Sequence, residues 1–319
     1  MSNKILVTGG AGFIGSNFIR HILNKYPDYE IVNLDKLTYC GNLANLRDIE
    51  NNPRYKFVKG DICDSEIVAK ALKDCDTIIN FAAESHVDRS IADASGFIRT
   101  NVYGTYVLLE AAKKNNISLF CQISTDEVYG SREAGLFKET DILKPSSPYS
   151  ASKAAADHLA LSYYITHHLP VVIVRSTNNF GLYQFPEKII PLFITNALEA
   201  KKVPVYGDGQ NVRDWLYVLD NCAAIDFVIH QGKVGEIYNV AGNNEMKNID
   251  LTCLILKIIK KPEDLIEFVQ DRPGHDRRYA LDSAKIGKLG WRPVHNFEQA
   301  LKETIEWYLN NQQWWQDLK

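Results

Sequence analysis

The segment 9–15, which reads Gly-Gly-Ala-Gly-Phe-Ile-Gly, constrains the fold of this chain more than any other stretch. It follows a short apolar run, Lys4–Thr8, and precedes residues 16–23, where apolar residues recur at helical spacing. Its glycines allow a tight turn from strand to helix, and they let a pyrophosphate approach the N–H groups at the helix N-terminus. A second strand-like run, 30–34, ends at Asp35, where a carboxylate can hydrogen-bond ribose hydroxyls. The stretch predicts a dinucleotide site that favours NAD over NADP.

Apolar runs and helical patterns then alternate along the first half of the chain. The runs that we expect to form strands are Tyr55–Lys59, 77–81, Leu119–Thr125 and 171–175, and the helical patterns lie at 67–72, 98–114 and 149–167. Such alternation is typical of a parallel sheet covered by helices on both faces. The sequence therefore predicts an α/β fold with a Rossmann-like doubly wound parallel sheet of six strands, which binds ligands at the carboxyl ends of the strands.

The regular alternation stops after Ser176. Residues 178–212 and 242–319 contain shorter, mixed segments, and we interpret them as the main part of a smaller mixed α/β lobe that binds the substrate. Residues 1–177 would form the NAD-binding domain, to which the chain would return at about 213–241. Two strand-like segments, 215–218 and Ile237–Val240, are the candidates for rejoining the main sheet. Residues 297–309 have the pattern of an amphipathic helix.

Composition narrows the classes of function. The 319 residues carry a net charge of −3, which gives no reason to expect binding to nucleic acid or to an anionic membrane. No apolar run approaches the roughly 18 residues of a transmembrane helix, and no signal peptide is expected from the N-terminal residues. The six cysteines are scattered without C-x-x-C spacing. We therefore expect neither a disulfide framework nor a metal site, and we predict a cytoplasmic location.

Tyr149 and Lys153 are four residues apart on a predicted helix and therefore share one face. A phenol has a pKa near 10, which is too high for a base at neutral pH, but a neighbouring ammonium and an oxidised nicotinamide would lower it. The pair could then take a proton from a hydroxyl while a hydride leaves the same carbon. Ser124 or Thr125, at the end of a predicted strand, could hydrogen-bond that hydroxyl.

Longer motifs resemble a known family. The segments GGAGFIG at 9–15, AAESHVD at 82–88 and YSASK at 149–153 resemble the extended short-chain dehydrogenase/reductases that act on nucleotide sugars. Within that family, the segments similar to the dTDP-glucose 4,6-dehydratases are STDEVYG at 124–130, SPYSASKAAADHL at 147–159, NNFGLYQFPEKIIPL at 178–192, YGDGQNVRDWLYVLD at 206–220 and DRPGHDRRYALD at 271–282. The resemblance covers nearly the whole chain. It departs where this chain has Phe180 and Leu182 in place of the family's usual tyrosine and proline.

The resemblance implies a hydro-lyase that uses NAD to convert dTDP-glucose to dTDP-4-keto-6-deoxyglucose. Tyr149 would deprotonate the C4 hydroxyl as the C4 hydride passes to NAD. Glu127 would remove the C5 proton that the new ketone acidifies, Asp126 would protonate the departing C6 hydroxyl, and the hydride would return to C6. Adjacent carboxylates with these opposite roles need different protonation states, with Asp126 neutral and Glu127 ionised. The residues alone do not predict that difference.

The same resemblance assigns residues to the two ligands. Beside the catalytic set of Thr125, Asp126, Glu127, Tyr149 and Lys153, the expected cofactor residues are Gly9, Gly12, Phe13, Ile14, Gly15, Asp35, Asp61, Ile62, Ala82, Ala83, Ser85, Thr100, Tyr149, Lys153 and Asn179. The expected substrate residues are His86, Thr125, Asn178, Asn179, Lys188, Leu192, Pro204, Val205, Tyr206, Arg213, Asn248, Arg272 and His275. Arg213 and Arg272 suit a diphosphate, because guanidinium groups bind such oxygens in bidentate fashion. A homodimer packed through the helices at 98–114 and 149–167, and a part in nucleotide-sugar metabolism such as dTDP-rhamnose biosynthesis, are implied as well.

Other activities on the same fold stay open. A UDP-sugar 4-epimerase or a UDP-glucuronate decarboxylase would use the same tyrosine and NAD, but neither needs an acid beside the base. Dehydratases of CDP- or GDP-sugars share the reaction and differ in the nucleotide. A non-catalytic NAD-sensing protein would have no use for Tyr149, Lys153 and both carboxylates.

Overall fold

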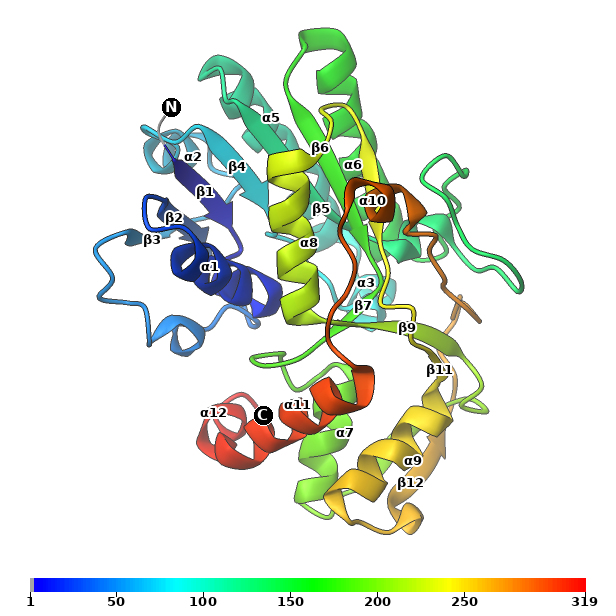
Figure 1. Ribbon diagram of the computed structural model, residues 1–319. Helices are drawn as coiled ribbons and strands as arrows, with labels where there is room; N and C mark the ends of the chain where they lie inside the picture. The colour runs from blue at the N-terminus through cyan, green and yellow to red at the C-terminus, as the bar shows by residue number, and fades with distance from the viewer. Residues whose placement is uncertain (1–2) are drawn as a thin grey trace.

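The main layer of the protein is a seven-stranded parallel sheet. The computed structural model describes residues 3–319, and the strand order is β10-β6-β5-β4-β1-β2-β3, with every neighbouring pair parallel (Figure 1). The strands are β1 (Lys4–Thr8), β2 (Glu30–Asp35), β3 (Tyr55–Lys59), β4 (Thr77–Asn80), β5 (Leu119–Thr125), β6 (Val171–Ser176) and β10 (Ile237–Val240). The predicted doubly wound sheet is confirmed, and β10 adds a seventh strand at its edge, as expected for Ile237–Val240.

Helices cover both faces of this sheet. The helices of this part of the chain are α1 (Phe13–Lys25), η1 (Leu43–Leu46), α2 (Ser65–Ala71), α3 (Val87–Ala92), α4 (Ser95–Phe97), η2 (Ile98–Gly104), α5 (Thr105–Lys114), η3 (Asp126–Tyr129), α6 (Pro148–His167) and α8 (Val218–Gln231). On β1, Ile5 and Val7 belong to one hydrophobic cluster and Leu6 to another, so alternate side chains serve the two faces. Within residues 3–319, no helix is long and apolar enough to span a membrane.

A smaller lobe lies below the main sheet in Figure 1. It contains a three-stranded sheet, β11-β9-β7, and a two-stranded sheet, β12-β8. Its elements are β7 (Asn178–Phe180), α7 (Ile189–Leu198), β8 (Val203–Tyr206), β9 (Val212–Tyr217), β11 (Glu245–Lys247), α9 (Asn248–Ile259), η4 (Glu263–Leu265) and β12 (Ile266–Val269). The prediction that 215–218 rejoins the main sheet is wrong, because β9 pairs with β7 and β11. Local apolar patterning identifies a strand but not its partners.

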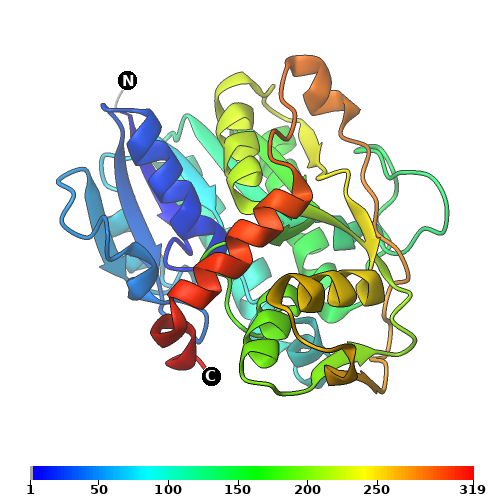
Figure 2. The same ribbon diagram turned by 60° about the horizontal axis from the view of Figure 1, so that its bottom comes forward.

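The chain ends in α10 (Ala284–Leu289), α11 (Phe297–Asn310) and α12 (Gln312–Gln316). Helix α11 runs between the lobe and the N-terminal part of the sheet (Figure 2). Trp314 Nε1 donates to Asn45 Oδ1 at 2.9 Å, and Asn45 Nδ2 donates to the backbone oxygen of Ala11 at 2.9 Å. The Tyr308 hydroxyl donates to the backbone oxygen of Gln184. The C-terminal helices therefore tie the glycine turn to the loop that follows β7.

Candidate active site

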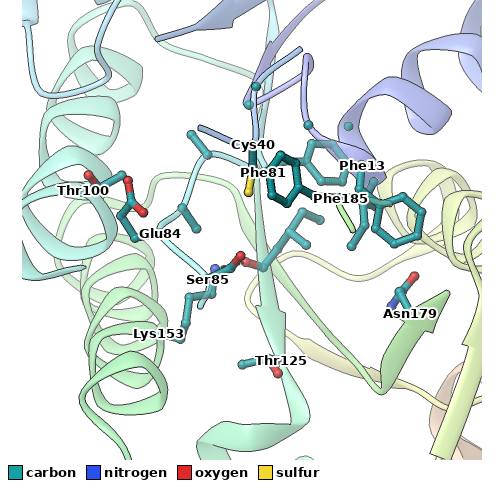
Figure 3. A pocket seen from close by; sticks show the side chains of 18 of the residues that line it. Phe13, Cys40, Phe81, Glu84, Ser85, Thr100, Thr125, Lys153, Asn179 and Phe185 are labelled. Carbon is teal, nitrogen blue, oxygen red and sulfur yellow. Dashed lines mark hydrogen bonds between the residues drawn. The ribbon is translucent and has the colours of Figure 1, made fainter. Parts of the chain in front are cut away.

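A cavity of about 320 Å³ lies at the carboxyl ends of the main-sheet strands. Its lining includes every residue that the sequence assigns to the cofactor, together with Thr125, Asp126 and Glu127. Figure 3 shows how distant segments meet there: Phe13 belongs to the N-terminal turn and helix, Lys153 to α6, and Thr125 to the end of β5. The structure thus brings together three stretches that are far apart in the sequence.

The glycine turn leaves space where any side chain would collide. Gly9 has a φ of +70°, and a Cβ on it would lie 2.7 Å from the backbone nitrogen of Ala82. A Cβ on Gly15 would lie 2.5 Å from the backbone oxygen of Gly9. The turn leads into α1, whose N-terminal N–H groups favour an anion. Asp35 accepts a hydrogen bond from the Ala11 N–H at 2.9 Å, which fixes its carboxylate beside the turn. These features fit the pyrophosphate and ribose of a dinucleotide.

Tyr149 and Lys153 are buried near the start of α6. Lys153 Nζ donates to the backbone oxygen of Ile123 at 2.5 Å. Burial lowers the pKa of Lys153 to about 8, and the charge of Asp157 opposes that shift. The pKa of Tyr149 is raised above its usual value by burial and by the charge of Glu127. The protein's own groups hold the phenol protonated, so the lowering expected from the sequence needs the positive charge of an oxidised nicotinamide.

The adjacent carboxylates differ in their surroundings. Asp126 is 2% exposed, and its Oδ2 meets no hydrogen-bond partner within residues 3–319. Burial, followed by the charge of Glu127, raises the pKa of Asp126 well above its usual value. Burial also raises the pKa of Glu127, but the guanidinium groups of Arg272 and Arg213 oppose that rise. The pKa of Asp126 is therefore raised further than that of Glu127, which makes Asp126 the better proton donor of the two.

Beside Thr125, three more of the residues expected to bind substrate line the cavity: Asn178, Asn179 and Lys188. Lys188 Nζ donates to the backbone oxygen of Ser85 at 2.9 Å. The side-chain oxygens of both asparagines are buried and have no partner in the described part of the chain. Buried acceptors of this kind fit a ligand that supplies O–H or N–H donors.

Tyr206, Arg272 and His275 form a second group at the smaller lobe. The Tyr206 hydroxyl donates to Asp88 Oδ2 at 3.0 Å, and Arg272 Nη1 lies 3.4 Å from Asp88 Oδ1. His275 Nδ1 lies 2.6 Å from a carboxylate oxygen of Asp271, and the rings of Tyr206 and His275 meet edge to face. Since Asp88 lies on α3, this group connects the lobe to the main domain. A guanidinium, an imidazole and a phenol together suit an anionic nucleotide.

Arg213 is more enclosed than a surface clamp. It is 5% exposed, and its terminal nitrogens donate to the backbone oxygens of Val212 and Asp276 at 2.7 and 2.9 Å. Its guanidinium lies 4.3 Å from the ring centre of Tyr279. A diphosphate would therefore have to share this group with backbone acceptors.

The remaining expected substrate residues are spread over several elements. His86 caps α3, Leu192 lies on α7, Pro204 and Val205 lie on β8, and Asn248 begins α9. Val205 is 1% exposed and packs in the main hydrophobic cluster. Its side chain therefore belongs to the core, and a contact with substrate through Val205 is restricted to its backbone.

Sequence reasoning missed part of the cavity wall. The additional lining residues include Lys36, Thr38, Cys40, Phe81, Glu84, Gln184 and Phe185. Lys36, Thr38 and Cys40 follow the acid that ends β2, so their position after a strand end could have identified them. Gln184 and Phe185 come from the loop after β7, where no periodic pattern exists to place them.

Comparisons with known proteins cover the whole fold. A family model described as GDP-mannose 4,6 dehydratase matches residues 6–304. The low-salt glycan biosynthesis protein Agl12 of Haloferax volcanii is 52% identical, with 96% of this chain and 99% of that protein covered. The dTDP-glucose 4,6-dehydratase 1 of Escherichia coli K12 is 49% identical, with 99% and 95% covered. A crystal structure of a dTDP-glucose 4,6-dehydratase from Streptomyces venezuelae with NAD bound has a TM-score of 0.97 at 48% identity, covering 99% of this chain and 100% of that chain.

Proposed function

This chain belongs to the family described as GDP-mannose 4,6 dehydratase, and we propose that it dehydrates dTDP-glucose to dTDP-4-keto-6-deoxyglucose. The observation that carries the proposal is the pair Asp126 and Glu127, which line one cavity with Tyr149 and differ in how far their pKa values are raised. An enzyme that only oxidises and reduces C4 has no use for an acid beside a base. Loss of water across C5 and C6 requires both.

The cofactor is NAD, which is bound in similar solved structures. When bound, NAD accepts the hydride from C4 and returns it to C6. In this chain the turn 9–15 would hold the pyrophosphate, and Asp35 would accept hydrogen bonds from the adenosine ribose. Tyr149 and Lys153 line the cavity where the nicotinamide end would lie.

Tyr149 would act first, as the base that takes the proton from the C4 hydroxyl. Its pKa is raised in the protein, so deprotonation depends on the positive charge that an oxidised nicotinamide would bring beside it. Thr125 lines the same cavity, where its hydroxyl donates to Asp126 Oδ1 at 3.1 Å. The product of the step is a ketone at C4.

The ketone acidifies the proton at C5, which Glu127 would remove. Asp126 would give its proton to the C6 hydroxyl, so the C6–O bond breaks and water leaves. Burial without a partner for Oδ2 keeps Asp126 ready to donate, and the charges of Arg272 and Arg213 keep Glu127 ready to accept. After the hydride returns to C6, Glu127 would protonate C5 with a proton that has exchanged with solvent.

Solvent deuterium tests this assignment. The protein is incubated with NAD and dTDP-glucose in deuterated water, and the product is examined by mass spectrometry and NMR. We expect the product to have lost one water and to carry one deuterium at C5. Glu127→Gln should abolish both while NAD binding persists, and Asp126→Asn serves as the matched variant that retains C5 exchange but slows water loss. A product that keeps its C6 hydroxyl and changes only its configuration at C4 would indicate an epimerase.

The nucleotide is the least constrained part of the proposal. The relatives that support it are dTDP-glucose 4,6-dehydratases, and the group of Tyr206, Arg272 and His275 offers an anion site beside an aromatic ring. Parallel turnover of dTDP-, UDP-, CDP- and GDP-glucose should show the highest kcat/KM for dTDP-glucose. A higher value for another nucleotide would move the chain to the corresponding dehydratase.

We further propose that the protein is a homodimer and works in the cytoplasm. Exposed apolar side chains gather on η2, α5 and α6, where Ile98, Tyr103, Tyr106 and Ile165 are between 42% and 71% exposed. A face of this kind suits a second copy. Six free cysteines accord with a reducing compartment. Sedimentation should give a dimer that Tyr103→Glu with Ile165→Glu converts to a monomer; a monomeric unmodified protein would contradict the dimer.

A further inference from the structure

A buried ion pair, Asp157 with Arg175, lies next to Ser124, which lines the active-site cavity. Ser124 Oγ donates to Asp157 Oδ2 at 2.9 Å, and Arg175 Nε donates to the same oxygen at 2.9 Å. Asp157 is 0% and Arg175 1% exposed. An ion pair this deep is costly to desolvate and is weak evidence for stability alone. A role in the chemistry accounts for keeping it there.

Asp157 continues the catalytic face of α6. Tyr149, Lys153 and Asp157 are spaced four residues apart, so they lie on the same side of the helix. The charge of Asp157 acts on Lys153, whose pKa burial has lowered to about 8. Without that charge, burial would act alone and less of the ammonium form would remain at neutral pH.

The other ionisable groups at this end of α6 belong to the neighbouring elements. Asp126 and Glu127 lie on η3 together with Tyr129, and Arg175 lies on β6. The charges of Asp126 and Glu127 act on Tyr149, whereas the charge that acts on Lys153 is that of Asp157. The two members of the catalytic pair therefore have different electrostatic neighbours.

Asp157 also orients Ser124. A serine hydroxyl has one proton to donate, and that proton is directed to Asp157. Ser124 lines the cavity beside Thr125. Its oxygen is therefore left to accept a hydrogen bond from a donor in the cavity other than the C4 hydroxyl, whose one proton goes to Tyr149.

The partner of Asp157 reaches the acid–base turn. Arg175 Nη1 donates to the Tyr129 hydroxyl at 2.8 Å, and that hydroxyl donates to Asn239 Oδ1 at 2.9 Å. Tyr129 ends η3, the turn that carries Asp126 and Glu127. The network therefore links the helix of the redox pair to the turn of the dehydration pair.

We propose that Asp157 is a positioning residue for this reaction, which holds the Ser124 hydroxyl as an acceptor and keeps Lys153 in its ammonium form. The part that concerns catalysis rests on the proposed function. The part that concerns Lys153 does not, since the charge state of that side chain can be measured without substrate.

The test is a titration of Lys153 in Asp157→Asn. Lysine labelled with ¹³C at Cε is incorporated, and the Lys153 resonance is identified by its loss in Lys153→Met. We expect the midpoint of Lys153 to lie near pH 8 in the unmodified protein and to fall by about half a pH unit or more in Asp157→Asn. Asp157→Glu keeps the negative charge, so its Lys153 midpoint should lie close to that of the unmodified protein. In turnover, the falling basic limb of kcat/KM should move to lower pH by the same amount.

The control is Asp226→Asn, which removes another fully buried carboxylate, one that lies between α1 and α8. It should leave the Lys153 midpoint unchanged. If Asp157→Asn leaves Arg175 unpaired and prevents folding, the pair Asp157→Asn with Arg175→Met removes both buried charges and should show the same fall. An unchanged Lys153 midpoint in a folded variant overturns the proposal, even if dehydration proceeds as proposed. Conversely, a protein that fails to dehydrate any sugar nucleotide but shows the fall refutes only the proposed function.

Discussion

Replacing Gly15 by alanine sets two physical effects against each other. Gly15 lies inside α1, where alanine ordinarily stabilises a helix by about 0.5–1 kcal/mol relative to glycine. Its new Cβ would lie 2.5 Å from the backbone oxygen of Gly9 and 2.8 Å from the Cα of Gly10. Both neighbours are backbone atoms of the turn, so they move only if the turn moves. Overpacking of this kind costs about 1–3 kcal/mol.

We expect the steric clash to outweigh the gain in helix propensity, and we expect it to weaken NAD binding. The atoms that must shift are those that bring backbone N–H groups toward the pyrophosphate. A net loss of about 1–2 kcal/mol corresponds to roughly 5- to 30-fold weaker binding. Calorimetric titration of NAD into cofactor-free Gly15→Ala and unmodified protein measures this directly.

Gly287→Ala is the matched control. Gly287 lies in α10, and no described heavy atom lies within 4 Å of a Cβ built there. NAD affinity should be unchanged in that variant, and stability unchanged or slightly higher. If Gly15→Ala binds NAD as tightly as the unmodified protein, the turn 9–15 is not the pyrophosphate site.

Three further outcomes are expected. Tyr149→Phe should lower kcat by about 10²–10⁴ in a dTDP-glucose turnover assay while NAD titration still saturates; a near-normal kcat would remove Tyr149 as the base. Trp314→Phe removes the donor to Asn45 and should lower the free energy of unfolding in urea by about 1 kcal/mol, and an unchanged value would show that the hydrogen bond contributes nothing. Although burial raises it, the pKa of Asp226 is lowered by hydrogen bonds, chiefly with His21 and His230, and the pKa of His230 is raised. The stabilisation that these interactions give the folded protein is fully present between about pH 4 and about pH 6.5. The stability lost in Asp226→Asn should therefore be greatest in that window and should shrink as pH rises through the His230 pKa.

The strands that the sequence predicted well are those whose surroundings are uniform. Strand β5 occupies residues 119–125 as expected. A central parallel strand is apolar on both faces, and this one ends immediately before the polar residues Asp126 and Glu127. Residues 215–218 show the limit of that reasoning. They have the apolar pattern of a strand, but β9 finds its partners, β7 and β11, only after two long excursions of the chain.

The site also contains features that local sequence predicts and features that depend on residues far away in the chain. The glycine turn and the Tyr149–Lys153 spacing follow from local geometry, so the sequence was enough to single them out. The rise in the pKa of Glu127 is limited by Arg272 and Arg213, which come from the other lobe, so the sequence could not predict it. Asp157 was missed because an aspartate in a helix gives no sign of whether it meets solvent or a buried arginine.

The proposed function depends on transient oxidation at C4 followed by return of the same hydride to C6. dTDP-glucose labelled with deuterium at C4 tests it directly, with the product analysed by NMR. We predict that the deuterium appears in the C6 methyl group of a 4-keto product and does not exchange with solvent. Deuterium that remains at C4, in a sugar that keeps its C6 hydroxyl, would contradict the dehydration and leave only epimerisation or binding.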